Sequence, residues 1–280
     1  MSVAESEASV TDAQFKRISQ VVYDHCGINL HDGKRQLVQA RLAKRLRVTG
    51  RRDVGGYLEW VLQDPNGPEF LNFIDSLSTN LTSFFRENQH FEYLKNKLLP
   101  DLIAKKNKSG RKQLRAWSAG CSSGEEPYTI AMTLCETSEM RGFDAKVLAT
   151  DISTAVLAKA AAGVYDAERI EGIPPQLRGK YFDPRKTSGG RAMAARPVLR
   201  DLISFRHLNL MERWPFTGPF DFIFCRNVMI YFDKPTQEKL VGRFHDCLAP
   251  GGILFTGHSE SLTGVKHAFT FVQATIYQKR

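Results

Sequence analysis

The chain has 280 residues, of which 42% are hydrophobic and 25% charged, a composition typical of a globular protein with a sizeable core. Its 39 Lys and Arg against 30 Asp and Glu give a net charge of +9, which favours an acidic partner. Residues 1–10 are polar and acidic, unlike a signal peptide, and no apolar run approaches the ~20 residues that a membrane span needs. We therefore expect a cytoplasmic protein without membrane insertion.

The cysteines give no sign of a disulfide framework or of a metal centre. There are five of them, an odd number, and no two form a CxxC pair. His245 and Cys247 are close in sequence, but two residues do not make a zinc site. We expect reduced thiols and no bound metal.

Helical spacing dominates the first quarter of the chain. Apolar residues recur every three or four positions, as in Phe15, Ile18 and Val22, and glycines separate the repeats. No alternation typical of a strand occurs there, so the pattern predicts a small all-helical domain over residues 1–77. The segment 78–88, which contains Asn80–Arg86, is expected to be a linker, and a further helix is expected over Gln89–Lys105.

After a polar break at residues 105–110, short apolar strands alternate with helices. Such alternation predicts βαβ units and a mostly parallel sheet within an α/β domain over residues 89–280. Residues 166–205 interrupt the rhythm with glycine, proline and short alternation, which indicates an inserted small β-subdomain. The expected strands are Gln113–Ala119, Lys146–Thr150, Phe220–Cys225, Ile253–Thr256 and Thr270–Tyr277, and the expected helices are Tyr128–Glu136, Ser153–Ala162 and Thr236–Leu248.

The loop Trp117–Tyr128 follows the first strand and opens a helix, the position of a nucleotide-binding loop. Its glycines have GxxxG spacing, which alone is a weak signal. Glu125 and Glu126 stand where a dinucleotide would place its pyrophosphate, and they would repel a phosphate there. A nucleoside that carries a positive centre and no phosphate fits better, and S-adenosylmethionine is such a molecule. The alternative is that the two acids only stabilise the helix N-terminus.

Polar residues follow two more strands of the predicted sheet. Asp151 ends the second strand, where an acid can accept hydrogen bonds from ribose hydroxyls, although it could instead cap the next helix. Arg226, Asn227 and Tyr231 follow the apolar strand Phe220–Cys225. Because ligands bind beyond the carboxyl ends of strands in such sheets, we expect these residues to lie at the site.

Six stretches of the sequence point to one family: NLTSFFRE (80–87), WSAGCSSGEEPYTIAM (117–132), ATDIS (149–153), NLM (209–211), FDFIFCRNVMIYFD (220–233) and LFTGHSE (254–260). Together they resemble the chemotaxis receptor glutamate methyltransferases, the CheR family. The resemblance implies a Rossmann-like S-adenosylmethionine-dependent methyltransferase domain with an inserted small β-subdomain, preceded by a small all-helical domain. It also implies methyl transfer to receptor glutamates, which gives glutamyl methyl esters for sensory adaptation and S-adenosylhomocysteine as the second product.

The resemblance assigns roles to particular residues. Tyr231 matches a family tyrosine near the transferred methyl group, and we expect it to orient the reactants together with Arg86. A glutamate with a pKa near ~4.3 is already ionised at pH 7, so the reaction needs alignment and exclusion of water rather than a general base. The residues that match family cofactor contacts are Asn80, Thr82, Arg86, Glu126, Asp151, Asn209, Leu210, Arg226 and Asn227.

A basic run lies between Gly33 and Arg52, with eight Lys or Arg and no acid. On a helix, Lys34, Arg41, Arg45 and Arg52 would share one face beside the apolar stripe Val38, Leu42 and Leu46. The simplest interpretation is a solvated cationic face, but the length of the run favours a docking surface for an acidic partner. The resemblance implies the cytoplasmic helical methylation region of a chemoreceptor as that partner, and Arg41 and Arg47 match family arginines implicated there. From the charge pattern we expect Arg45 to contact the receptor as well. It also implies, for some members, a receptor C-terminal peptide added as a strand to the β-subdomain, with Lys186–Gly190 as a plausible loop.

Two other functions compete with this one. A nucleic-acid methyltransferase would suit the positive charge, but the chain has no Asn/Asp-Pro-Pro-Tyr/Phe turn and no Pro-Cys nucleophile, and no aromatics interleave with the basic run. We therefore expect no nucleic-acid partner. A non-enzymatic adaptor would leave the joint presence of Glu126, Asp151, Asn227 and Tyr231 without a purpose.

Overall fold

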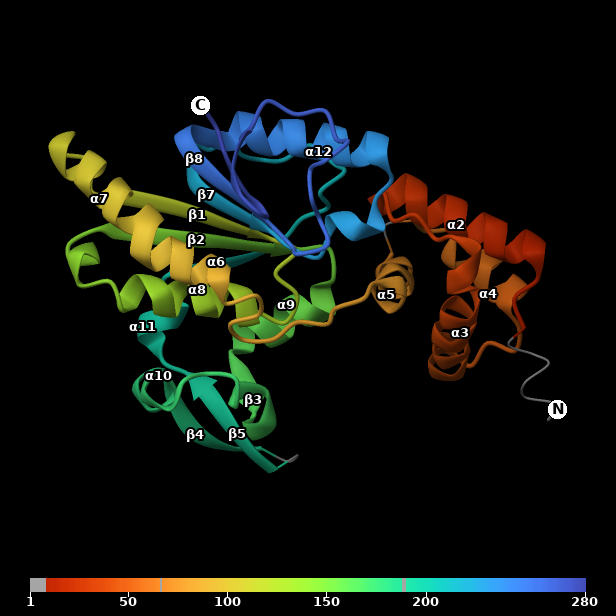
Figure 1. Cartoon of the computed structure of the whole chain (residues 1–280). Helices are drawn as coiled ribbons and strands as arrows, with labels where there is room; N and C mark the ends of the chain where they lie inside the picture. The colour runs from red at the N-terminus through yellow and green to blue at the C-terminus, as the bar shows by residue number, and fades with distance from the viewer. Residues whose placement is uncertain (1–8, 66, 188–189) are drawn as a thin grey trace. The chain divides into compact units, whose positions relative to one another are not determined.

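The computed structural model of the chain describes residues 9–65, 67–187 and 190–280. They form two compact units (Figure 1). The helical unit comprises the chain up to Thr79 together with Tyr231–Thr236, and the sheet unit comprises Asn80–Ile230 with Gln237–Arg280. Every helix among the described residues is too short or too polar to cross a bilayer.

Within the described residues up to Thr79, the helical unit contains four α-helices: α2 (Asp12–Cys26), α3 (Arg35–Thr49), α4 (Val54–Val61) and α5 (Pro68–Leu77). The predicted stripe Val38, Leu42 and Leu46 is buried. Because α3 spans only Arg35–Thr49, Lys34 and Arg52 lie outside it, and the expectation that they share a helical face with Arg41 and Arg45 is wrong. Gly50, with a φ of 69°, ends the helix before Arg52.

Arg45 holds this unit together. Its guanidinium binds both carboxylate oxygens of Glu69 on α5, with Nε 3.0 Å from Oε1 and Nη2 2.5 Å from Oε2. The Tyr57 hydroxyl of α4 donates to the same carboxylate at 2.7 Å. Burial raises the pKa of Tyr57, and the hydrogen bond to Glu69 raises it further. Three helices are therefore joined at one half-buried polar cluster.

The sheet unit contains a seven-stranded sheet in the order β6-β2-β1-β7-β8-β10-β9. Neighbours from β6 to β8 run parallel, and β10 and β9 are antiparallel, as expected for a mostly parallel α/β fold. The expected last strand is in fact two, because Thr275 adopts a φ of 63° and turns the chain between them. The strands are β1 (Gln113–Ala119), β2 (Asp144–Asp151), β6 (Ile203–His207), β7 (Phe220–Cys225), β8 (Leu248–Thr256), β9 (Thr270–Gln273) and β10 (Ile276–Gln278).

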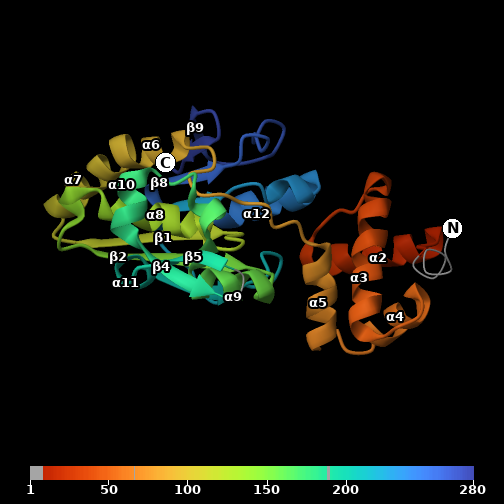
Figure 2. The ribbon, with the colours of Figure 1, turned by 90° about the horizontal axis from the view of Figure 1, so that it is seen from below.

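Helices cover both faces of this sheet (Figures 1 and 2). On one side lie α6 (Gln89–Tyr93) and α7 (Leu99–Lys108), joined by a π-helical turn at Leu94–Leu98, with α8 (Glu125–Cys135) and α9 (Thr154–Ala162). On the other side lies α12 (Lys234–Cys247), whose Phe244 packs against Trp117 with ring centroids 5.3 Å apart. Because helices cover both faces of the sheet, a polar site is expected beyond the carboxyl ends of its parallel strands.

The expected inserted subdomain is a three-stranded antiparallel sheet in the order β3-β5-β4. Its strands are β3 (Val164–Asp166), β4 (Phe182–Thr187) and β5 (Gly190–Ala195), with the short helices α10 (Pro175–Tyr181) and α11 (Pro197–Arg200). Residues 203–205, expected in this subdomain, instead belong to β6, which pairs with β2 in the large sheet. β4 is an edge strand, so strand addition by a receptor peptide stays a prediction; Ser188 and Gly189 of the expected loop lie outside the described residues.

Candidate active site

Two glycines shape the loop between β1 and α8. Gly120 and Gly124 have φ values of 83° and 99°, a region that favours glycine. A Cβ on Gly120 would lie 2.3 Å from Cγ2 of Val228, and one on Gly124 would lie 2.8 Å from the Tyr165 hydroxyl. The loop backbone therefore lies against its neighbours without side chains between them, as close approach of a ligand requires.

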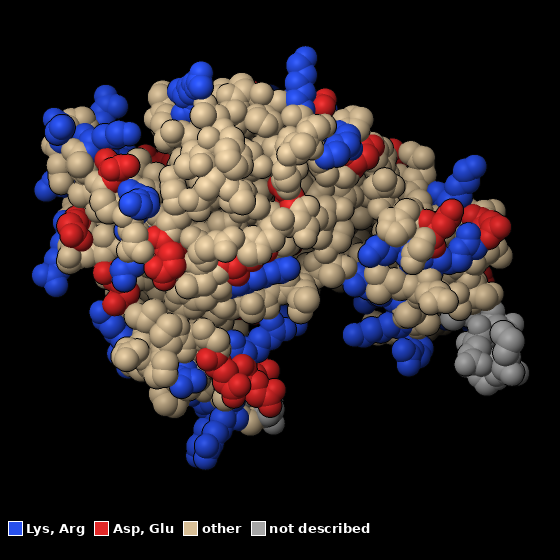
Figure 3. Space-filling view, viewed as in Figure 1, with Lys and Arg blue, Asp and Glu red and all other residues tan. Residues whose placement is uncertain are grey.

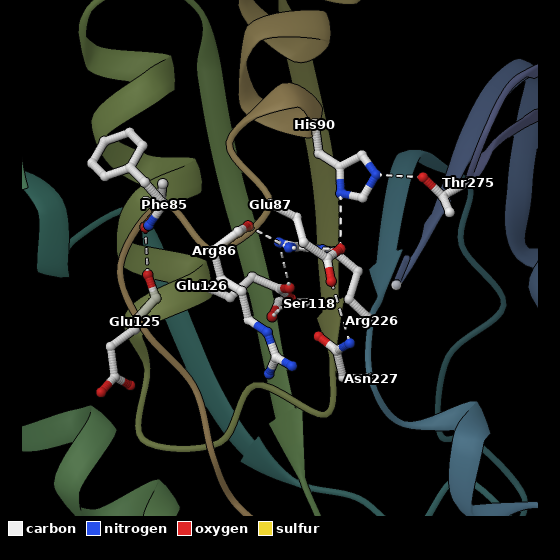
Figure 4. A network of polar contacts seen from close by, with 12 residues as sticks. Phe85, Arg86, Glu87, His90, Ser118, Glu125, Glu126, Arg226, Asn227 and Thr275 are labelled. Atoms are coloured by element: carbon white, nitrogen blue, oxygen red, sulfur yellow. Dashed lines mark hydrogen bonds and ion pairs between the residues drawn. The ribbon is translucent and has the colours of Figure 1, made fainter. Parts of the chain in front are cut away.

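Arg226, directly after β7, is the centre of the polar network at the strand ends (Figure 4). Its side chain is 2% exposed. Nη2 lies 3.1 Å from Oε2 of Glu87, Nη1 lies 3.3 Å from Oε2 of Glu126, and the Arg86 carbonyl accepts a further bond from Nη2. One guanidinium thus joins the linker, the first turn of α8 and the end of β7.

Two carboxylates share this one cation, which leaves an excess of negative charge. Burial raises the pKa of Glu126, and Arg226 together with the Ser118 hydroxyl, 2.7 Å away, opposes that rise. Burial also acts to raise the pKa of Glu87, but Arg226 and hydrogen bonds from the His258 and Asn227 N–H groups outweigh it and lower the pKa. Such a site suits a cationic ligand better than a phosphorylated one.

Glu125 plays a different part from its neighbour. Its side chain is completely buried, and Arg169 pairs with it at 2.9 Å while the Ser123 hydroxyl donates to it at 2.7 Å. The charge of Glu125 is therefore neutralised locally. Both acids of the loop were expected to repel a phosphate. Because Glu125 is neutralised, only Glu126 can do so.

Asp151, at the end of β2, is buried and binds the backbone. Oδ2 accepts from the Ser122 N–H at 2.8 Å and Oδ1 from the Ser153 N–H at 3.0 Å. The Ser153 hydroxyl, not Asp151, caps α9 by accepting from the Val156 N–H. Asp151 thus orders the loop after β1 as well as the start of the next segment, and the ribose role stays a proposal.

Asn209 and Leu210 follow β6 and come next to Asp151, whose carbonyl accepts from the Leu208 N–H at 3.0 Å. The Asn209 side chain is 2% exposed, and its oxygen accepts from the Met211 N–H at 3.0 Å. The Leu210 carbonyl accepts from the Trp214 indole and the Arg243 guanidinium. Both predicted residues therefore form a fixed turn at the strand ends.

The linker residues reach the same edge through their backbone. The Asn80 carbonyl accepts from the Ser122 hydroxyl at 2.9 Å, and the Thr82 carbonyl lies 3.5 Å from Nη1 of Arg169. The Arg86 guanidinium donates to the Leu81 carbonyl at 2.8 Å and points away from the network that its own carbonyl joins (Figure 4). The predicted residues Asn80, Thr82 and Arg86 are thus brought to the loop after β1.

Sequence reasoning missed two acids that arrange this site. Glu260 is 5% exposed and accepts from the N–H groups of Asn227 at 2.7 Å, Ile230 at 3.1 Å and Gly257 at 2.6 Å. Burial raises the pKa of Glu260, although these hydrogen bonds act to lower it. Glu260 thereby holds Asn227 at a φ of 58°. Like Glu87, it lies in a stretch that carried the family resemblance, but only the fold shows what it binds.

One cluster has the composition of a metal site. Ligand atoms of Glu87, His90 and His258 lie within 4.8 Å of one another. His90 is completely buried, its Nε2 lies 2.7 Å from the Thr275 hydroxyl, and burial lowers its pKa to about 3. The Glu87 oxygen that would bind a cation lies 3.1 Å from Arg226, whose positive charge opposes one. We therefore interpret the cluster as part of the hydrogen-bond network.

The other predicted residues belong to the helical unit. Tyr231 ends the turn Met229–Tyr231, and its carbonyl accepts from the Asn29 N–H at 2.8 Å. Arg41 donates to the Ser78 carbonyl at 2.7 Å, Arg45 binds Glu69, and Arg47 is exposed on α3. Tyr231 is assigned to the helical unit, whereas the predicted cofactor-binding residues belong to the sheet unit.

The fold and the site define a class of protein. A mostly parallel sheet, a glycine-shaped loop after its first strand and carboxylates in excess at the strand ends are the features of a Rossmann-like enzyme for a cationic nucleoside. These features define an S-adenosylmethionine-dependent methyltransferase.

Comparison with known proteins gives the family. Residues 80–278 match the model of the CheR methyltransferase SAM binding domain, and residues 13–78 match that of the CheR methyltransferase all-alpha domain. The chain therefore belongs to the CheR methyltransferase family, and S-adenosylmethionine is its cofactor.

The chain is similar to several chemotaxis protein methyltransferases over almost their whole length. The chain is 43% identical over 270 residues to a chemotaxis protein methyltransferase of Escherichia coli, covering 96% of this chain and 91% of that protein. It is 41% identical to one of Borreliella burgdorferi, with 97% and 95% covered, and 42% identical to chemotaxis protein methyltransferase 2 of Pseudomonas aeruginosa, with 97% and 94% covered.

Proposed function

We propose that this protein transfers the methyl group of S-adenosylmethionine to glutamate side chains of chemotaxis receptors, in the cytoplasm, and thereby serves sensory adaptation. The observation that carries the proposal is the pair Glu87 and Glu126 sharing Arg226 at the strand ends, which favours a cationic methyl donor. The name of its relatives, chemotaxis protein methyltransferase, supports the receptor as substrate.

A carboxylate acceptor agrees with the chemistry of the site. Bound S-adenosylmethionine supplies an electrophilic methyl group on a positively charged sulfur. A glutamate is already ionised at pH 7, so no residue has to remove a proton from it. Asp151 is held by two backbone N–H groups and Glu126 by Arg226 and Ser118, which suits binding and alignment better than proton transfer.

The purified chain tests this proposal directly. We expect radiolabelled methyl groups to pass from S-adenosylmethionine to receptor-containing membranes, and the label to be released as methanol by mild base, since methyl esters are labile to base. Label in DNA or RNA, or a product stable to base, would instead support a different acceptor. Membranes without receptors are the control.

Tyr231 is proposed to orient the reactants, together with Arg86. Replacement of Tyr231 with alanine is expected to lower kcat by about 10²-fold or more, the effect of misplaced reacting groups, while the affinity for S-adenosylhomocysteine stays within about twofold. Initial rates on receptor membranes and calorimetry measure the two quantities. Unchanged turnover with intact cofactor binding would remove Tyr231 from the mechanism.

The receptor is proposed to dock on the cationic surface of α3. Figure 3 shows Lys and Arg side chains gathered on this part of the surface. Among the predicted docking residues, Arg45 binds Glu69 with only 16% of its side chain exposed, so its reversal would report folding rather than docking. Arg47 and Lys44 are exposed and are better probes.

Charge reversal by Arg47→Glu with Lys44→Glu is expected to lower kcat/KM for receptor at least tenfold, because like charges would then face an acidic partner. The affinity for S-adenosylhomocysteine should not change. The loss should shrink at high salt, which screens surface charge. A double variant with wild-type receptor methylation at low salt would show that α3 does not dock.

A further inference from the structure

The inserted subdomain contacts the loop between β1 and α8 and the first residue of α8. Arg169 lies in the short helix Ala167–Ile170, directly after β3. Its Nη1 is 2.9 Å from Oε1 of Glu125, the first residue of α8, and 3.5 Å from the Thr82 carbonyl of the linker. Half of the Arg169 side chain is exposed, whereas that of Glu125 is completely buried. One residue of the insertion thus bonds to both other parts of the site.

Further contacts join the inserted subdomain to the loop after β1 and to the linker. The Tyr165 hydroxyl of β3 donates to the Ser123 carbonyl at 2.8 Å, next to Glu125 in the loop. Phe84 of the linker packs edge-on against Tyr165 and Phe182, with ring centroids 5.0 and 5.7 Å apart. The subdomain therefore holds the loop and the linker by polar and aromatic contacts at one junction.

Arg169 is needed because the carboxylate that it pairs with, that of Glu125, is buried. A buried charge is tolerated only where it is paired or well hydrogen-bonded, and Glu125 is bound by Arg169 and by the Ser123 hydroxyl. Without the guanidinium, Glu125 would be a buried charge without its cation, and its side chain would turn toward water. Glu125 and Glu126 are consecutive residues in the first turn of α8, so a movement of one displaces the other, which contacts Ser118 and Arg226.

We infer that Arg169 is a positioning residue for cofactor binding: it neutralises Glu125 and so holds the first turn of α8 and the linker in the form that binds S-adenosylmethionine. The inserted subdomain thereby has a role in the cofactor site itself. The inference rests on the proposed placement of the cofactor at the β1–α8 loop.

The effect is expected in cofactor affinity rather than in turnover. Arg169→Ala should weaken binding of S-adenosylhomocysteine about tenfold and raise the KM for S-adenosylmethionine by a similar factor, with kcat nearly unchanged. A charge-assisted hydrogen bond to a buried group supports a change of this size, reduced here by the exposure of Arg169. Arg169→Lys, which keeps the charge, should lose less than the alanine variant.

A matched control comes from the same subdomain. Arg196 pairs with Asp183 at 2.8 Å, but both side chains are exposed, and neither belongs to the site. Arg196→Ala should leave the affinity for S-adenosylhomocysteine unchanged. Because Arg169→Ala leaves a buried charge, adding Glu125→Gln removes that charge and should restore folding and most of the affinity.

The outcomes separate the inference from the proposed function. If the wild-type chain does not bind S-adenosylhomocysteine, the placement of the cofactor fails. If it binds and Arg169→Ala binds equally well, or if the double variant with Glu125→Gln binds as weakly as Arg169→Ala, only the inference is overturned. Thermal unfolding of each variant shows which of them are folded. Where Arg169→Ala is unfolded, the folded double variant is compared with the wild type: affinity close to wild type supports the inference, and a loss of tenfold or more overturns it.

Discussion

Arg226→Met is expected to abolish measurable cofactor binding and methyl transfer. The side chain is 2% exposed and joins Glu87, Glu126 and the Arg86 carbonyl. Methionine fills similar space without charge, so two carboxylates lose the cation that they share. Breaking a buried ion pair costs about 3–5 kcal/mol of free energy. If about 3 kcal/mol of this cost weakens cofactor binding, the affinity falls about 100-fold or more. Calorimetry with S-adenosylhomocysteine measures the change.

Two further variants show whether the geometry of Arg226 or only its charge is needed. Arg226→Lys keeps the charge but has one nitrogen in place of the planar fork that spans the three acceptors, so this variant should bind the cofactor at a level between Arg226→Met and wild type. Arg115→Met removes the ion pair to Asp144 at the opposite end of the sheet, where the Arg115 side chain is 35% and that of Asp144 50% exposed, and should leave cofactor affinity unchanged. Wild-type affinity in Arg226→Met would contradict the view of Arg226 as the centre of the site.

Asp151→Asn is expected to weaken cofactor binding by about 10- to 100-fold and to lower the stability of the fold by about 1–3 kcal/mol. The carboxylate accepts from the N–H groups of Ser122 and Ser153, and an amide can accept with only one of its two polar atoms. The loop after β1 would therefore lose part of its support. Chemical unfolding and calorimetry measure the two effects separately.

The same variant distinguishes the ribose role from the structural one. If Asp151 binds the ribose, an analogue of S-adenosylhomocysteine without the ribose hydroxyls should bind the wild type much less tightly than the parent compound does. In Asp151→Asn that difference should shrink, because the amide keeps only one of the two acceptor oxygens of the carboxylate. A difference of equal size in both proteins would show that Asp151 only orders the loop.

Arg226 and Arg169 are expected to differ in what their loss does. Arg226 is enclosed and serves two acids, whereas Arg169 is half exposed and serves one. Loss of the first should therefore remove binding, and loss of the second should only weaken it. The cofactor site of this protein is held from two sides, by the strand that ends before Arg226 and by the inserted sheet.

Much of this architecture follows from local sequence patterns. The alternation of strands and helices predicted a mostly parallel sheet, and strand β1 was expected at Gln113–Ala119, where it is found. Asp151, Arg226 and Asn227 could be placed at one edge because parallel strands end on the same side. The motif stretches, through the resemblance that they carry, implied the family and the cofactor that comparison with known proteins confirms.

Partners far apart in the sequence were decided by tertiary structure alone. Glu87 and Arg226 are 139 positions apart, and nothing local to either indicates that they pair. Glu125 and Glu126 are adjacent and chemically equal, yet the helix turns one toward Arg169 and the other toward Arg226. Residues 203–205 were expected in the inserted subdomain but belong to the large sheet, because they pair with β2. Their own sequence pattern does not indicate this pairing. Sequence determined which residues carry charge and where strands end, whereas only packing decided which charges neutralise each other.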